Sequence, residues 1–366
     1  MIGALKEAWA NFRGFDTTGS TVPPMDGPLR PNARLDAAPL LLAIEDVDNL
    51  TATPAGLLCS VGAEIHQLIA EGDTLRIAAT RTMPGTVTAM AASGGRLAIA
   101  IAGACIQIEA EGAAPRIVAL DGIDAGHVTA MSFAGPATLY VAIGSSRHPA
   151  REWKRDLMTK TAAGSVLRLD LVQGRASVIA RDLAFPSGIL ASGGRLFVSE
   201  AWRHRVLSLA ADGGKPEIAL GALPAYPGRI APSSTGGYWL AMFAPRNPLV
   251  EFVLKEKDYR RRMVETIDAD YWIAPSLATG RSFLEPIQGG ARKKLNMLKP
   301  WSPTWSTGLV ARCGADMAML ESWHSRADGA VHGITSLAEM NGRLMAGAKG
   351  SGKIVAFDRI DEGSAA

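Results

Sequence analysis

Three titratable side chains, His127, His332 and Asp48, are the best candidates for proton transfer in this chain. Each histidine stands directly before a predicted β-strand. Imidazole exchanges a proton near neutral pH, so either ring is suited to act as a general base or as a ligand. Asp48 stands at the start of another predicted strand and supplies a carboxylate for the same chemistry. The alternative for each histidine is a structural ring that is hydrogen-bonded at the rim of the fold.

Arg229 is the best candidate for binding an anion. It follows Pro227 and Gly228, and a guanidinium group can bind a carboxylate or phosphate through two parallel hydrogen bonds. An ion pair with Asp48 is the alternative. Ser187 is a second candidate for ligand binding, with a structural serine as its alternative. It is not expected to be a nucleophile, because it lacks the Gly-x-Ser-x-Gly turn that exposes a catalytic serine.

Glu200 and Trp202 follow a predicted strand, within the sequence Ser-Glu-x-Trp-x-x-Arg. We expect them on the same face as the other ligand-binding candidates or at a junction between repeats. Pairing of Glu200 with Arg203 or Arg205 is the alternative.

A repeated unit positions all of these residues. The stretch from Phe185 to Leu209 contains two β-prone runs joined by a Ser-Gly-Gly turn, then a polar link and a third strand. Related layouts recur, most of them about 40 residues apart, which is the length of a four-stranded propeller blade. The strand before each repeat is expected to complete the sheet of a neighbouring blade. The repeats begin near Val47, Val87, Val128, Ser187, Arg229 and Ile334.

The sequence therefore predicts an all-β fold, a six-bladed β-propeller. In such propellers the innermost strand of each blade begins near one mouth of the central channel. Alignment of the repeats places one short segment of each inner strand around that mouth. Asn49 and Thr335 become ligand-binding candidates on this ground, beside Asp48, Ser187 and Arg229.

Two long intervals between repeats are insertions, at about residues 145–163 and 255–305. Insertions of this kind often cover one face of a repeat array. Residues 41–366 are expected to form a single propeller, and residues 1–40 an extension packed on it. The extension is expected to begin with a short amphipathic helix that docks on the protein, with a membrane surface as the alternative.

Composition excludes several classes of function. The chain of 366 residues carries 38 Lys and Arg against 35 Asp and Glu, with the two signs interspersed, so nucleic-acid binding is not expected. Cys59, Cys105 and Cys313 lack metal-ligand spacing and are expected to be free thiols. The sequence shows neither a signal peptide nor a run of about 18 apolar residues that could span a membrane. We therefore expect a cytoplasmic protein.

Two motifs give the chain a resemblance to a known family. Ser199–Arg205 and the Pro-Arg-Asn-Pro-Leu run at Pro245–Leu249 are similar to those of the strictosidine synthase-like six-bladed propellers, relatives of the senescence marker protein and gluconolactonase family. The segments 145–171 and 332–358 extend the resemblance over most of residues 47–358. It implies a six-bladed propeller with a ligand site at the channel mouth.

The resemblance also implies where a metal would bind. Metal-dependent lactonases of the wider family have one Glu, two Asn and one Asp at the mouth. Here Asp48 can replace the Glu, but Ser187, Gly228 and a Thr stand at the other places. One carboxylate with neutral hydroxyls holds a divalent cation poorly, and Arg229 would repel it, so no cofactor is expected. Thr335 stands where alkaloid-forming synthases use a catalytic Glu, so that condensation is not expected either.

Two functions remain. The resemblance implies a small-molecule hydrolase that acts on an ester or lactone in the channel mouth, with His127, His332 and Asp48 as acid/base candidates. The alternative is a non-catalytic propeller that binds an anionic metabolite or a protein partner, because the usual metal ligands and the catalytic Glu are missing.

Overall fold

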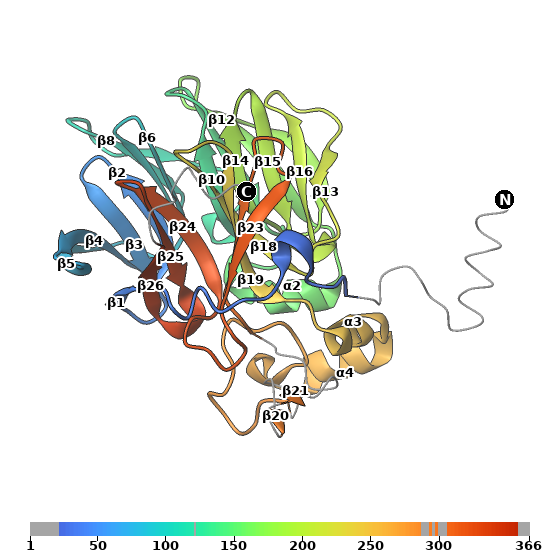
Figure 1. The fold of residues 1–366 in the computed structure, drawn as a ribbon. Coiled ribbons are helices and arrows are strands. Elements are labelled where there is room, and N and C mark those ends of the chain that lie inside the picture. The colour runs from blue at the N-terminus through green and yellow to red at the C-terminus, as the bar shows by residue number, and fades with distance from the viewer. Residues whose placement is uncertain (1–21, 121, 287–292, 295–296, 299–305, 358–366) are drawn as a thin grey trace.

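The computed structural model describes residues 22–120, 122–286, 293–294, 297–298 and 306–357. The expected N-terminal helix lies outside these residues. Six four-stranded antiparallel sheets are arranged so that the inner strand of each contacts the inner strands of its two neighbours (Figure 1). The ring of sheets confirms the six-bladed β-propeller predicted from the repeats.

The strands of each blade follow one another from the channel outward. Blade one contains β2 (Asp48–Thr53), β3 (Gly56–Val61), β4 (Glu64–Glu71) and β5 (Thr74–Thr82). Blade two contains β6 (Val87–Ser93), β7 (Arg96–Ile101), β8 (Ile106–Ala110) and β9 (Arg116–Val118). Blade three contains β10 (Val128–Phe133), β11 (Thr138–Ile143), β12 (Gly164–Asp170) and β13 (Arg175–Leu183). Blade four contains β14 (Pro186–Ser192), β15 (Arg195–Glu200), β16 (Arg205–Ala210) and β17 (Glu217–Leu220). Blade five contains β18 (Ala225–Pro232), β19 (Tyr238–Pro245), β22 (Leu309–Cys313) and β23 (Met319–His324).

Blade six joins the two ends of the described chain. It contains β24 (Ile334–Met340), β25 (Arg343–Ala348), β26 (Lys353–Ala356) and β1 (Leu40–Ala43). β1 pairs antiparallel with β26, and buried Leu41 shares a core cluster with Ile354. The strand before the first repeat therefore completes the last blade, which closes the ring.

The glycine pair of the repeated turn has a geometric cause. Gly193 and Gly194 join β14 to β15 with φ values of 57° and 75°. Two successive left-handed residues make the tight turn that matches the twist of paired strands, and glycine adopts this conformation without strain. Each sheet turns one face toward the next blade, and the aliphatic side chains on these facing surfaces pack together to form the core between blades.

The insertions lie in blades three and five and carry the α-helices. The first contains α2 (Trp153–Thr159), and the second contains α3 (Pro248–Lys255), α4 (Lys257–Thr266) and the small ladder of β20 (Lys293–Lys294) and β21 (Met297–Leu298). Helix α3 begins before residue 255, where the insertion was expected to start, because Asn247 caps its first turn by accepting a hydrogen bond from the Leu249 amide at 2.8 Å.

Helices α2, α3 and α4 lie together at one end of the propeller (Figure 1). Short 3₁₀ helices occur at Gly27–Leu29, Ala125–His127, Ala150–Glu152, Ala201–Arg203, Ala269–Tyr271 and Lys349–Ser351. No helix in the described part of the chain is long and apolar enough to cross a membrane.

Candidate functional site

A cavity of about 320 Å³, here called the mouth cavity, lies where the six inner strands begin. Each blade contributes to its wall from its inner strand, from the first two residues in five blades and from the middle of β18 in blade five. The contributing residues, in blade order, are Asp48, Thr88, Thr129, Ser187, Arg229 with Gly228, and Thr335. The structure thus brings together Asp48, Ser187, Arg229 and Thr335, four of the candidates that alignment of the repeats had placed at the mouth.

A ring of hydrogen bonds joins each blade to the next at this level, and we call it the inter-blade ring. Every donor belongs to an inner strand, and most donate to a backbone carbonyl of the following blade or of the segment that leads into it. The bonds are Asn49 Nδ2 to Val87 O (3.3 Å), Thr88 Oγ1 to Ala125 O (2.9 Å), Thr129 Oγ1 to Pro186 O (2.5 Å), Ser187 Oγ to Pro227 O (2.7 Å), Arg229 Nη1 to Thr335 O (3.0 Å) and Thr335 Oγ1 to Asp48 Oδ1 (3.0 Å).

The inter-blade ring defines what the mouth hydroxyls can do. Ser187 donates its proton to a backbone carbonyl, which cannot accept that proton as a general base would. The Ser187 hydroxyl is therefore used for the contact between blades four and five. The lone pairs of Ser187 and Thr129 remain available to accept a hydrogen bond from a ligand.

Asp48 is the centre of a charged cluster at the mouth. Its Oδ1 accepts hydrogen bonds from Arg229 Nη1 at 2.5 Å and from the Asn49 amide at 2.8 Å, and its Oδ2 accepts from Lys349 Nζ at 3.2 Å. Arg229 also donates through Nη2 to Thr88 O at 3.2 Å. The guanidinium group therefore bridges four blades, and the ion pair with Asp48 is the arrangement that the structure contains.

The cluster keeps Asp48 ionised. Burial alone would raise the pKa of its carboxyl group, but the charges of Arg229 and Lys349, with hydrogen bonds from Asn49 and Thr335, outweigh burial and hold the pKa well below its usual range. A carboxylate with so low a proton affinity is a weak general base. Asp48 is therefore better suited to orient the two cations than to remove a proton from a substrate.

The same cluster does not fit a divalent cation. Arg229 Nη1 and Lys349 Nζ both lie against Asp48, the one carboxylate among the described residues that line the mouth cavity. These two cationic groups would repel a metal ion bound to the Asp48 carboxylate. The hydroxyl groups of the mouth are neutral and hold a divalent cation poorly. No group of three or more His, Cys, Asp or Glu side chains with metal-binding geometry occurs among the described residues.

Apolar side chains cover the rest of the mouth cavity. The large ones are Trp153 from α2, Phe185 before β14, Phe243 from β19 and Leu277 from the second insertion. Both insertions thus contribute to the wall, as expected for loops that cover one face of the propeller. The cavity combines a charged base with a largely aromatic cover, the usual composition of a small-molecule site.

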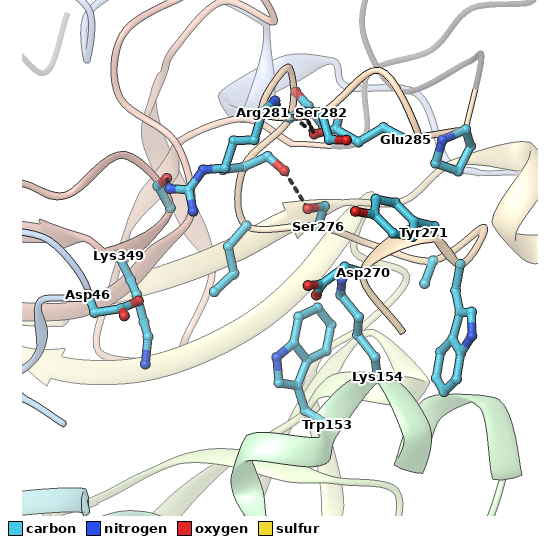
Figure 2. A pocket seen from close by; sticks show the side chains of 17 residues that line it. Asp46, Trp153, Lys154, Asp270, Tyr271, Ser276, Arg281, Ser282, Glu285 and Lys349 are labelled. Carbon is cyan, nitrogen blue, oxygen red and sulfur yellow. Dashed lines mark hydrogen bonds between the residues drawn. The ribbon is translucent and has the colours of Figure 1, made fainter. Parts of the chain in front are cut away.

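A second cavity of about 340 Å³, the outer cavity, shares Trp153, Leu277 and Lys349 with the mouth cavity. Figure 2 shows Asp46 and Lys349 at one end of the outer cavity, with Trp153 and Lys154 rising from one side. Glu285 is not free to bind a ligand there, because its carboxylate accepts hydrogen bonds from the backbone amides of the neighbouring turn.

Neither histidine candidate is among the residues that line the mouth cavity. His127 lies in a 3₁₀ helix before β10, with its Nδ1 2.6 Å from Ser145 O. His332 is buried and bonded on both sides, to Ser306 Oγ at 2.8 Å and to Arg326 O at 3.0 Å. Burial lowers the pKa of His332. Its neighbours indicate a neutral ring that donates from Nε2 to the carbonyl.

Three further candidates lie behind the cavity wall. Asn49 is buried, and its side chain bonds Ser60 Oγ at 2.7 Å within blade one. Glu200 is fully buried and receives hydrogen bonds from Arg203 at 2.5 Å and Arg205 at 2.6 Å, which is the alternative considered for it. Trp202 stacks on the back of Phe185, with the ring centroids 4.5 Å apart.

Sequence reasoning missed Lys349, although a signal for it was present. Lys349 directly follows β25, the second strand of blade six, as Ala201 follows β15 in blade four. Residues that follow the second strand were considered in blade four, where Glu200 and Trp202 were selected. The same rule applied to blade six would have selected Lys349.

Comparisons with known proteins support the family resemblance. Adipocyte plasma membrane-associated protein from Homo sapiens is 30% identical over 135 residues, covering 34% of this chain and 32% of the relative. Strictosidine synthase-like 6 from Arabidopsis thaliana is 25% identical over 167 residues, covering 45% of this chain and 44% of the relative. The chain therefore matches less than half the length of these curated relatives. No family model matches it.

Solved structures show the same fold. Regucalcin from Agrobacterium tumefaciens, described as a calcium-binding protein, has a TM-score of 0.53 at 13% identity and covers 88% of this chain and 92% of its own. A putative gluconolactonase has a TM-score of 0.53 at 12% identity and covers 87% and 90%. These structures show the propeller fold, and the motifs and the curated relatives support the resemblance of this chain to the strictosidine synthase-like six-bladed propellers.

Proposed function

We propose that the mouth cavity binds a small molecule that has a carboxylate and an apolar body. The observation that carries this proposal is the position of Lys349. Its ammonium group lines the cavity, and its side chain is 33% exposed. The described contacts of Lys349 engage one of its three N–H donors, the one directed at Asp48.

The charge of the mouth cavity favours an anion. Arg151, Arg229 and Lys349 line it together with Asp48, so positive charge is in excess. Arg229 already uses both of its terminal nitrogens within the inter-blade ring and the cluster. Arg151 is 81% exposed at the rim, where solvent screens its charge. Lys349 is therefore the cation best placed to meet a ligand carboxylate.

The cover of the cavity indicates the rest of the ligand. Trp153, Phe185, Phe243 and Leu277 present rings and an aliphatic side chain to the space above Lys349. A volume of about 320 Å³ is at the small end of the range for small-molecule sites. These properties fit an aryl or medium-chain alkyl carboxylate.

Lys349→Met tests the proposal. Isothermal titration calorimetry with benzoate and octanoate is expected to show binding to the wild-type protein and about 10- to 100-fold weaker binding to Lys349→Met, the loss of one charge-assisted hydrogen bond. Benzamide, the neutral counterpart of benzoate, should bind both proteins equally. Arg151→Met is the matched control, with a smaller expected loss. Absence of carboxylate binding to the wild type, or equal affinity in Lys349→Met, would contradict the proposal.

Hydrolysis of an ester or lactone in the same cavity is the second candidate. Lys349 favours it, because its ammonium group beside a carbonyl oxygen would stabilise the negative charge that develops on that oxygen. Turnover of p-nitrophenyl esters and aldonolactones is then expected to fall in Lys349→Met and to persist in His127→Ala and His332→Ala. Loss of turnover in either histidine variant with Lys349→Met unaffected would assign the reaction to another site.

A further inference from the structure

The Ser-Glu-x-Trp-x-x-Arg motif supplies no wall of the mouth cavity, yet it contacts several residues that do. Trp202 is at its centre. The Trp202 ring lies 4.5 Å from Phe185, 6.2 Å from Trp153 and 6.3 Å from Phe243, measured between ring centroids. All three partners line the mouth cavity. The Trp202 side chain thus contacts all three aromatic residues that line the cavity.

Phe185 has a backbone conformation that needs support. Its φ is 58°, in the left-handed region that a bulky aromatic residue seldom adopts. The motif provides this support through the backbone. The Ala201 amide donates to Phe185 O at 3.0 Å, and the Trp202 amide donates to Ala184 O at 3.2 Å. The Glu200 carboxylate accepts from the Ala184 amide at 2.7 Å.

Trp202 also fixes the helix of the first insertion. Its Nε1 donates to Asp156 Oδ1 at 2.8 Å, and Asp156 is 1% exposed on α2. Helix α2 begins with Trp153, so this hydrogen bond holds a wall residue that comes from a different blade. A phenylalanine at position 202 would retain the ring contacts and lose this bond.

We propose that Trp202 is the positioning residue that sets the shape of the mouth cavity, by holding Phe185 directly and Trp153 through Asp156. The proposal rests on the proposed function, in that the cavity so shaped receives the apolar body of the carboxylate. Trp202 then determines which apolar bodies fit, while Lys349 determines that the ligand is an anion.

The test compares ligands that use the walls with one that does not. Benzoate and octanoate are expected to bind Trp202→Ala about 3- to 10-fold more weakly than the wild type, the value of an aromatic contact. Acetate, which reaches only Lys349, should bind both equally. Trp202→Phe keeps the ring contact with Phe185 and loses the bond to Asp156, so it should recover only part of the benzoate affinity. Trp323→Ala, on the outer strand of blade five, is the matched control that removes a buried tryptophan and leaves all three affinities unchanged.

A structure of the variants tests the positioning itself, whether or not a carboxylate binds. In Trp202→Ala, or in Asp156→Leu if that protein does not fold, Phe185 or Trp153 is expected to leave its place in the wall. Leucine has about the size of the aspartate side chain and no oxygen to accept the Trp202 Nε1 hydrogen bond. Unchanged walls, or an equal loss of affinity for acetate and benzoate, would overturn the proposal. A wild-type protein that binds none of the three anions would instead contradict the proposed function. The positions of Phe185 and Trp153 in the structures of the variants would then test the role of Trp202.

Discussion

Asp48→Ala is expected to destabilise the propeller by about 3–5 kcal/mol, the cost of removing one partner from a buried ion pair. The Asp48 side chain is 17% exposed and Arg229 is 19% exposed. Without the carboxylate, the guanidinium group of Arg229 and the ammonium group of Lys349 lie close together with no counter-charge between them. The inter-blade ring also loses its bond from blade six to blade one.

Chemical denaturation measures this effect, and two further variants isolate its cause. Asp48→Asn keeps the shape of the side chain and should cost less than Asp48→Ala. The double variant Asp48→Ala, Arg229→Met should be less destabilised than the sum of the single variants, because fewer unpaired charges remain. Glu217→Ala breaks a pair in which Glu217 is 75% exposed, and should cost less than about 1 kcal/mol. An Asp48→Ala protein as stable as Glu217→Ala would show that the cluster does not hold the blades together.

The pKa of Asp48 gives the same cluster a pH dependence. Its pKa is lower in the folded protein than in the unfolded chain. Its contribution to stability is therefore complete above the ordinary carboxyl pKa of about 3.9 and is lost as the pH falls toward the folded value. Thermal unfolding should show the gap between wild type and Asp48→Asn narrowing below about pH 4.

The fold could be predicted because a propeller repeats one local pattern. Most blades use a similar turn between their first two strands. The turn at Gly193 and Gly194 therefore gives a fixed point from which the residues of other blades can be aligned. That alignment also fixes which residue of each inner strand reaches the channel, and it brought Asp48, Ser187, Arg229 and Thr335 to one cavity. The place of a residue in the fold could be predicted where that residue belongs to the repeated unit.

The remaining parts of the site depend on contacts that no repeat encodes. Trp153 and Leu277 belong to the insertions, and their place over the mouth depends on how α2 and the second insertion pack. His127 and His332 precede inner strands, yet they point toward loop carbonyls. Sequence spacing places a residue near the mouth and does not specify the direction of its side chain, which the nearest hydrogen-bond partner decides.

Glu200→Ala is expected to destabilise the protein by about 3 kcal/mol through a different cause. Glu200 is fully buried and serves three donors: the Ala184 amide, Arg203 and Arg205. Arg203 and Arg205 are 44% and 25% exposed, so both can turn toward water when the carboxylate is removed. The Ala184 amide belongs to the backbone and has no such freedom, so it loses its acceptor inside the protein.

Matched variants separate the backbone contact from the ion pairs. Arg203→Met removes one exposed partner and should cost less than about 1 kcal/mol. Glu200→Gln retains an oxygen that can accept from the Ala184 amide, and it should cost less than Glu200→Ala. Chemical denaturation of the three variants gives the order of their stabilities. A Glu200→Ala protein that is as stable as Arg203→Met would contradict this prediction. Because Ala184 directly precedes Phe185, Glu200→Ala should also weaken benzoate binding, which links the most buried residue of the motif to the wall of the cavity.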